Sequence, residues 1–239
     1  MVGDVGVVYL LVGVVGFIAP PLLSVPHRLL AMTSTSLKHF SMIREFHLAD
    51  FLTLANVACG LAAVLFCMIY MGSQSSSHFF AATAMTPAAL LFDWLDGRVA
   101  RWRRMHSALG RELDSLADII SFGVAPAVLG FAAGMRGGWD WIALMYFVCC
   151  GVSRLARYNV TAESLSEGKD KVAYFEGTPI PTTMLLTTVL AVAAWQGRLG
   201  ENLYWGTWTV GPFDLHPLAL LFVLSGTLMI SKTLRIPKV

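Results

Sequence analysis

The chain is dominated by apolar segments that are long enough to cross a lipid bilayer. A spanning helix needs roughly 20 consecutive, mostly apolar residues, and such segments recur along the whole sequence. They lie at about residues 5–24, 50–71, 79–97, 115–134, 139–159, 179–197 and 215–232. Because a helix satisfies its own backbone hydrogen bonds in lipid, the sequence predicts an all-α polytopic membrane helix bundle with six core transmembrane helices.

The N-terminal hydrophobic segment stands apart from these six. It contains Gly13, Gly16, Pro20 and Pro21, and it lacks the basic residues that precede the apolar core of a secretory signal. We expect it to span the membrane, lie in the interface or form a poorly ordered extension. Residues 1–40 are therefore predicted to be an N-terminal extension with a hydrophobic segment, and residues 41–239 to form the membrane domain.

The composition excludes several other classes of protein. Hydrophobic residues make up 56% of the chain and charged residues 13%, whereas soluble proteins carry about 25% charged residues. The net charge of +2 is too small to indicate a nucleic acid as partner. The four cysteines lie in apolar segments without a CxxC pair, so we interpret them as packing residues. The six histidines are scattered, and we assign them no role.

The basic residues predict the orientation in the membrane. Fifteen of the 17 lysines and arginines fall on one predicted side of the membrane. They lie before the 50–71 segment, between the third and fourth segments, between the fifth and sixth segments, and after the last segment. The intervening connections hold only Arg136 and Arg198. Because cytoplasmic loops carry the excess of positive charge, we expect the basic side, and the C-terminus, to face the cytoplasm.

Four aspartates follow a helical pattern on the predicted cytoplasmic side. Asp93 and Asp96 belong to one stripe, and Asp114 and Asp118 to a second that starts at Gly110. Residues three and four apart share a helix face, and the residues between the stripes allow the chain to bend. We therefore expect four carboxylates to converge near the ends of two neighbouring spans.

Unpaired carboxylates in such a place would repel each other and resist desolvation. A divalent cation or a pair of them resolves this, since oxygen ligands suit Mg²⁺ or Mn²⁺ and also hold substrate phosphates. Gly97 and Gly110 leave room for close approach, and Arg101 offers a fixed donor fork for phosphate. The alternative is that the acids pair with neighbouring arginines at the membrane surface.

The complete pattern is D-x-x-D-G-x-x-A-R-x8-G-x3-D-x3-D, and it resembles that of the CDP-alcohol phosphotransferase family. Its eight fixed positions are filled by Asp93, Asp96, Gly97, Ala100, Arg101, Gly110, Asp114 and Asp118. The resemblance implies that the four aspartates bind two metal ions that hold the CDP diphosphate. It also implies that Asp118 is the general base, and that the glycines, Ala100 and Arg101 belong to the CDP-diacylglycerol site.

Flanking segments resemble the branch of the family that uses L-serine as acceptor, and they are most similar to fungal members. These segments are residues 47–50, 114–127, 153–160, 174–183 and 225–235. A zwitterionic acceptor needs a cation for its carboxylate, and Arg154 and Arg157 lie at the cytoplasmic end of a span. We predict that these arginines and Asn159 bind serine; the alternative for the arginines is anchoring at the interface or binding lipid phosphates.

Asn56 is a polar residue inside a predicted span. The family places an asparagine of this kind near the cytidine end of the nucleotide, whereas a helix–helix hydrogen bond is the alternative. The resemblance implies transfer of a phosphatidyl group from CDP-diacylglycerol to L-serine with release of CMP. It also implies a homodimer, and an endoplasmic reticulum membrane location in a eukaryote.

Three other functions fit part of the pattern. A transferase of the same family would use another alcohol, such as inositol or glycerol phosphate. A cation- or proton-coupled transporter would place acids through the depth of the membrane, not beside a glycine motif at one face. A prenyltransferase with aspartate-rich motifs would lack the G-x-x-A-R continuation.

Overall fold

The computed structural model describes four parts of the chain, residues 48–103, 108–167, 174–231 and 235–237. They belong to one compact unit, Met42–Val239, and most of their residues are helical. The predicted N-terminal extension, with its apolar segment at 5–24, lies outside the described residues.

Within the described part, helical segments coincide with the six apolar segments predicted from residue 50 onward. They are α3 (Leu48–Ser73), α4 (Ser76–Arg103), the continuous α5 (Ala108–Asp118), η1 (Ile119–Val124) and α6 (Ala125–Ala133), α7 (Gly138–Glu167), η2 (Ile180–Thr183) with α8 (Met184–Trp195), and α9 (Ala219–Ile230). Two stretches are long and apolar enough to span a bilayer, Ala49–Ser73 and Leu109–Ala133, and two apolar helices are shorter. The prediction of a mostly helical fold is confirmed, and these apolar helices are consistent with a membrane protein, while the count of six spans stays a prediction.

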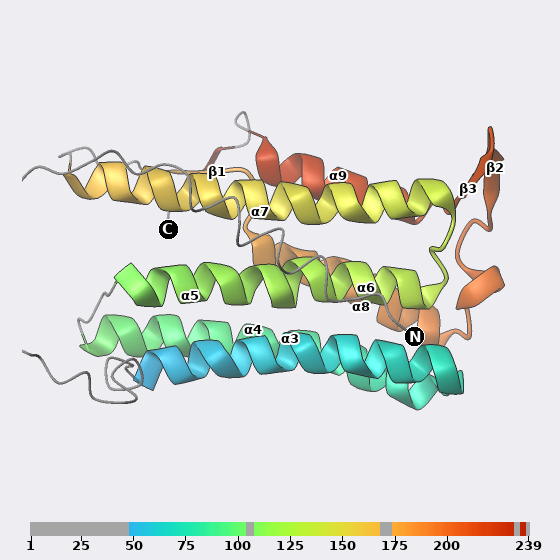
Figure 1. The fold of residues 1–239 in the computed structure, drawn as a ribbon, viewed down its shortest axis with the longest axis horizontal. Coiled ribbons are helices and arrows are strands. Elements are labelled where there is room, and N and C mark those ends of the chain that lie inside the picture. The colour runs from blue at the N-terminus through green and yellow to red at the C-terminus, as the bar shows by residue number, and fades with distance from the viewer. Residues whose placement is uncertain (1–47, 104–107, 168–173, 232–234, 238–239) are drawn as a thin grey trace, which may run out of the picture. The chain divides into compact units, whose positions relative to one another are not determined.

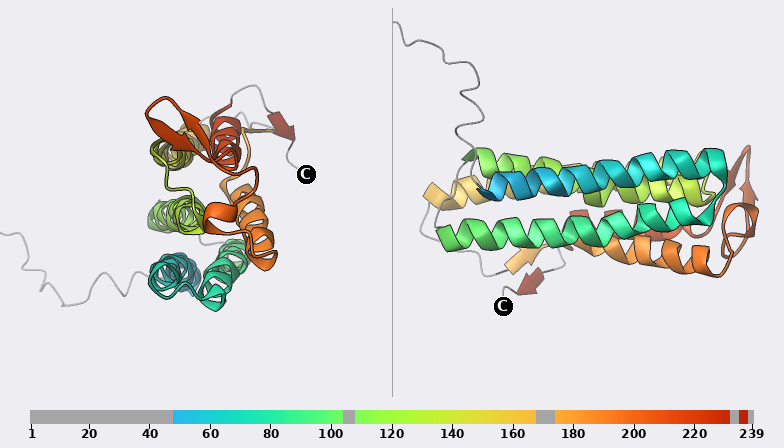
Figure 2. Two further views of the ribbon diagram at one scale, coloured as in Figure 1. Left: turned by 90° about the vertical axis from the view of Figure 1, so that its right-hand side faces the viewer. Right: turned by 90° about the horizontal axis from the view of Figure 1, so that it is seen from below.

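The helices stack in three tiers of two (Figures 1 and 2). Helix α3 packs along α4, the α5–α6 segment lies beside α8, and α7 packs along α9. In the candidate span on α3, 28% of the residues are buried inside the protein, against 67% in the span on α5–α6. The α5–α6 segment is therefore the central helix of the bundle, while α3 presents large apolar side chains outward, as a lipid-facing helix does.

A π-helical turn, η1, interrupts the central helix directly after Asp118. Two hydroxyl groups secure this turn: Ser121 Oγ donates to the Asn56 carbonyl oxygen at 2.9 Å, and Thr183 Oγ1 donates to the Phe122 carbonyl oxygen at 2.7 Å. Helix α3 approaches closely here, since a Cβ atom at Gly60 would lie 2.5 Å from Ser121 Oγ. The hydropathy pattern does not predict this turn, although π-helical turns frequently occur at functional sites.

Short strands join the connecting segments at each end of the bundle. Strand β1 (Tyr174–Glu176) pairs antiparallel with β4 (Arg235–Pro237), and β2 (Trp208–Val210) pairs antiparallel with β3 (Phe213–Leu215). The β2–β3 hairpin follows the short helix η3 (Gly200–Asn202) and lies at the end where α7 begins (Figure 1). The all-α prediction did not include these strands, which are too short to give a periodic signal.

A buried aspartate holds this end of the bundle together. Asp140, in the first turn of α7, accepts hydrogen bonds from the backbone nitrogens of Gly137 and His216 at 2.9 and 2.8 Å. The Nδ1 atom of His216 also lies 2.6 Å from Asp140 Oδ2. His216, which received no role in the sequence analysis, thus connects the segment before α9 to the start of α7.

Candidate active site

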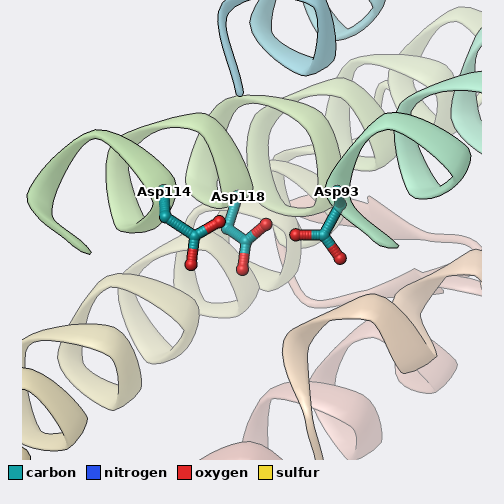
Figure 3. A group of neighbouring side chains, drawn as sticks. All are labelled: Asp93, Asp114 and Asp118. Carbon is teal, nitrogen blue, oxygen red and sulfur yellow. The ribbon is translucent and has the colours of Figure 1, made fainter. Parts of the chain in front are cut away.

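Three of the four predicted aspartates bring their carboxylates together at the opposite end of the bundle from the β2–β3 hairpin. Asp93 comes from α4, and Asp114 and Asp118 come from successive turns of α5. One carboxylate oxygen of each lies within 4.8 Å of the others. Figure 3 shows Asp118 between the other two, with the Asp93 carboxylate directed toward it. Asp118 is buried, whereas Asp93 and Asp114 are half-buried.

The fourth aspartate, Asp96, is held separately. It is buried on α4, one turn after Asp93, and its Oδ2 accepts a 2.8 Å hydrogen bond from Thr53 Oγ1 of α3. Its charge still acts on the cluster, because its electrostatic interactions reach Asp93 and Asp114. Helical spacing on α4 therefore places Asp96 beside the cluster, and Thr53 of α3 fixes the orientation of its carboxylate.

The donor set of the cluster fits a divalent cation. Three carboxylates so close together repel one another, and partial burial strengthens the repulsion. Asp118 Oδ1 is buried and has no hydrogen-bond partner among the described residues. A buried acceptor without a partner is costly, and a cation bound by several carboxylates would satisfy it with the oxygen ligands that Mg²⁺ and Mn²⁺ prefer.

The remaining motif residues line the helices that carry the acids. Gly97 lies beneath the side chain of Arg101, because a Cβ atom at Gly97 would lie 3.5 Å from Arg101 Nη1. Arg101 is exposed and lines a surface groove with Arg98, Val99 and Trp102. Ala100 and Gly110 are half-buried, on α4 and α5 respectively.

The predicted serine-binding residues on α7 differ in their surroundings. Arg154 interacts electrostatically with Asp118, and its Nε is buried without a hydrogen-bond partner among the described residues. Arg157 instead donates from Nη2 to the Ile230 carbonyl oxygen at 3.3 Å, at the C-terminal end of α9. Of these two arginines, Arg154 is therefore the one with an available donor beside the acidic cluster.

Asn159 contacts α5. Its Nδ2 donates to Ser115 Oγ at 3.0 Å and to the Glu112 carboxylate at 3.4 Å. Ser115 Oγ also lies 3.2 Å from Asn159 Oδ1. The asparagine thus connects α7 to the helix that carries Asp114 and Asp118.

The Asn56 side chain is fully buried on α3, and neither Nδ2 nor Oδ1 has a hydrogen-bond partner within the described part of the chain. The helix–helix contact at this residue uses its backbone carbonyl, which accepts from Ser121. The side-chain amide is therefore unsatisfied, as expected of a group that awaits a ligand or an ordered water.

Thr53 and Ser115 were missed by the sequence analysis as parts of this region. Thr53 lies three residues before Asn56, so both fall on the face of α3 that meets α4 and η1. Thr53 could have been found from its helical spacing to Asn56, the polar residue inside the predicted span. Ser115 directly follows Asp114, yet its partner Asn159 lies 44 residues away, and spacing alone does not predict that pairing.

The helical bundle and its aspartate cluster define a class of protein. The profile of the CDP-alcohol phosphatidyltransferases matches residues 46–213, which cover all four aspartates and most of the described helices. The chain belongs to the CDP-alcohol phosphatidyltransferase family.

Individual relatives carry a more specific name. The chain is 42% identical over 205 residues to the CDP-diacylglycerol–serine O-phosphatidyltransferase of Saccharomyces cerevisiae, a match that covers 84% of this chain and 74% of the relative. It is 33% identical over 164 residues to the Mycobacterium tuberculosis protein of the same name, covering 68% of this chain and 52% of that protein. The Methanocaldococcus jannaschii protein of that name is 34% identical over 150 residues, which are 62% of this chain and 61% of that one.

Proposed function

We propose that this protein transfers the phosphatidyl group of CDP-diacylglycerol to L-serine, giving phosphatidylserine and CMP. The observation that carries the proposal is the convergence of Asp93, Asp114 and Asp118, with a buried oxygen lacking a partner, beside the Arg154 side chain. The names of the relatives support serine as the acceptor over inositol or glycerol phosphate. The family match disfavours a transporter, because the family is one of transferases.

The aspartate cluster is the proposed site for divalent metal, either Mg²⁺ or Mn²⁺. Asp93, Asp114 and Asp118 would supply ligands directly, and Asp96 would complete the site from its position on α4. Bound there, the metal would neutralise the diphosphate of the substrate and the charge on the departing CMP.

The chain's own residues then orient the substrates and move one proton. The serine hydroxyl attacks the phosphorus that bears the diacylglycerol; a new oxygen–phosphorus bond forms, and the bond from that phosphorus to the oxygen of CMP breaks. Asp118 accepts the hydroxyl proton as the general base. Holding the two reactants in line supplies much of the rate enhancement in such a transfer.

The nucleotide and diphosphate are assigned to residues of α3, α4 and α5. Asn56 would satisfy its buried amide against the cytidine, and Arg101 would pair with the phosphates from its place over Gly97. Ala100 and Gly110 have small side chains or none, so they allow a substrate to approach both helices closely.

Arg154 is proposed to bind the serine carboxylate. It has an available donor beside the cluster, and a guanidinium matches a carboxylate in a bidentate manner. Arg157 and Asn159 would act from farther out, through their contacts with α9 and α5. Serine and CMP exchange from the cytoplasm, while the lipid substrate enters from the bilayer.

The membrane arrangement is part of the same proposal. Residues 41–239 would form the membrane domain, with six spanning helices and the active site facing the cytoplasm, as the distribution of basic residues predicts. Cysteines introduced at Arg111 and at Ser75, both exposed and at opposite ends of the bundle, should be labelled from opposite sides of sealed vesicles. Labelling of Arg111→Cys only from the outer or lumenal side would refute this orientation. The homodimer and the endoplasmic reticulum location stay predictions.

The decisive experiment measures CMP release by the purified protein from CDP-diacylglycerol, with L-serine, inositol and glycerol phosphate supplied in turn. We expect metal-dependent release with serine alone. The variant Asp93→Asn should abolish it, whereas Asp214→Asn, an exposed acid at the other end of the bundle, should not. Release with inositol or glycerol phosphate but not serine would refute the acceptor and leave the family chemistry intact.

A further inference from the structure

The β2–β3 hairpin has one apolar and one polar face. Antiparallel partners point to the same side of a sheet and successive residues to opposite sides. One face carries the pairs Trp208↔Leu215 and Val210↔Phe213, and the other carries Thr209↔Asp214. The polar face is closed by a hydrogen bond of 3.0 Å from Thr209 Oγ1 to Asp214 Oδ1. The hairpin is therefore amphipathic.

Most of the apolar face is uncovered by the described residues. Trp208 is 55% exposed, Val210 46% and Phe213 49%. A two-stranded ribbon is marginally stable by itself in water, and contiguous exposed apolar side chains mark a surface that meets another apolar phase. Something apolar is therefore needed to cover this face.

Contacts with α7 fix the direction of this face. Trp139, in the first turn of α7, donates from Nε1 to the Val210 carbonyl oxygen at 2.8 Å, and its ring meets the Phe213 ring edge-to-face at 6.1 Å. The hairpin runs across the helix axes and reaches past the start of α7, as Figures 1 and 2 show. Phe213 packs on the bundle, so the face it belongs to is turned toward the helices and away from the solvent beyond their ends.

Exposed tryptophans at the same end of the bundle indicate what covers the apolar face of the hairpin. Trp139 and Trp141 lie at the start of α7, Trp195 at the end of α8, and Trp205 just before β2. Tryptophan is enriched where a membrane protein crosses the interface between hydrocarbon and water. The apolar face of the hairpin lies next to these tryptophan rings and extends laterally beyond the bundle.

We propose that the β2–β3 hairpin is a membrane-interface anchor. Its apolar face rests on the lipid of the non-cytoplasmic leaflet, immersed by about 5–10 Å as amphipathic interfacial elements are, and its Thr209–Asp214 face meets water. The proposal depends on the membrane arrangement proposed above but not on the choice of acceptor. The anchor would fix the depth of α7, the helix that carries Arg154.

The test compares two neighbouring residues on opposite faces. Val210→Cys and Thr209→Cys are made in a background where Cys59 and Cys149, the two cysteines that are not buried, are serines. Each is labelled with an environment-sensitive fluorophore, and the protein is placed in lipid nanodiscs. The Val210 label should emit at shorter wavelength and be quenched several-fold more by lipids with a nitroxide near the headgroup. The Thr209 label should be quenched mainly by a water-soluble nitroxide.

Two results would overturn the anchor. Water-like emission from both labels would place the hairpin in solvent, and shielding of the Val210 label from both quenchers would mean that protein covers it. Serine-dependent CMP release is measured on the same samples. A sample active with serine but lacking the quenching difference refutes the anchor alone, and a sample with the difference but without serine activity refutes the acceptor alone.

Discussion

Thr53 on α3 donates a buried 2.8 Å hydrogen bond to Asp96 on α4. The threonine hydroxyl also lies 3.2 Å from the Ala49 carbonyl oxygen of its own helix, so its position is set by α3. One carboxylate oxygen of Asp96 is thereby held in a fixed orientation. Groups that orient metal-binding side chains in this way tune affinity as well as geometry.

Thr53→Val should weaken metal binding and activity by about 10–100-fold, the range for lost orienting partners of metal ligands. Valine keeps the volume of threonine and removes only the hydroxyl, whereas Thr53→Ser keeps the bond and serves as the control. Mn²⁺ binding, followed by electron paramagnetic resonance, gives a readout independent of turnover. Wild-type affinity in Thr53→Val would mean that the bond has no part in orienting Asp96.

Asp118→Asn should lower kcat by about 10²–10⁴-fold, the contribution of a general base, while the affinity for CDP-diacylglycerol changes far less. A group whose main role is in the transition state affects turnover more than substrate binding. Asp114→Asn is the comparison, because it should chiefly raise the metal concentration needed for half-maximal activity. Equal effects of the two variants on turnover and on metal demand would contradict a separate role for Asp118 as base.

Arg154→Lys should raise the KM for serine by about tenfold, corresponding to 1.4 kcal/mol, with little change in the KM for CDP-diacylglycerol. Lysine keeps the charge and loses the bidentate fork that matches a carboxylate. Arg157→Lys should affect serine less and thermal stability more, because Arg157 binds the last carbonyl of α9. Steady-state kinetics with each substrate varied in turn separates these outcomes, and a reversed pattern would move the serine site to Arg157.

Asp140→Ala should lower the apparent melting temperature of the detergent-solubilised protein by several degrees. The change leaves the backbone nitrogens of Gly137 and His216 without their acceptor, at a cost of about 1–3 kcal/mol for the buried His216 donor. Asp214→Ala, which removes an exposed hydrogen bond at the same end, is the matched control. Similar melting temperatures for the two variants would show that the buried cluster contributes no special stability.

The sequence predicts the helices and the acidic site well because both depend on local periodicity. Apolar segments of spanning length identify the helices, and steps of three and four residues place Asp93 and Asp96 on one stripe and Asp114 and Asp118 on another. The helices that carry these stripes are present, and three of the four carboxylates meet.

Features that depend on contacts between distant segments were not predictable in this way. The bond between Thr53 and Asp96 joins residues 43 positions apart, and that between Asp140 and His216 spans 76. Neither leaves a periodic trace in the sequence. The same holds for Arg157: its place near the end of a predicted span is compatible with several roles, and its contact with Ile230 distinguishes them.

The π-helical turn after Asp118 has a consequence for how this sequence can vary. Such a turn contains one residue more than an α-helical turn, and each residue of an α-helix advances its face by about 100°. The wider turn accommodates this extra residue, so a single deletion within Ile119–Val124 would convert it to an α-helical turn and leave the aspartates of α5 facing nearly the same way relative to α6. A further insertion would instead rotate them by about 100°. Between Asp118 and Ala125, homologous sequences should therefore tolerate the loss of one residue better than the gain of one.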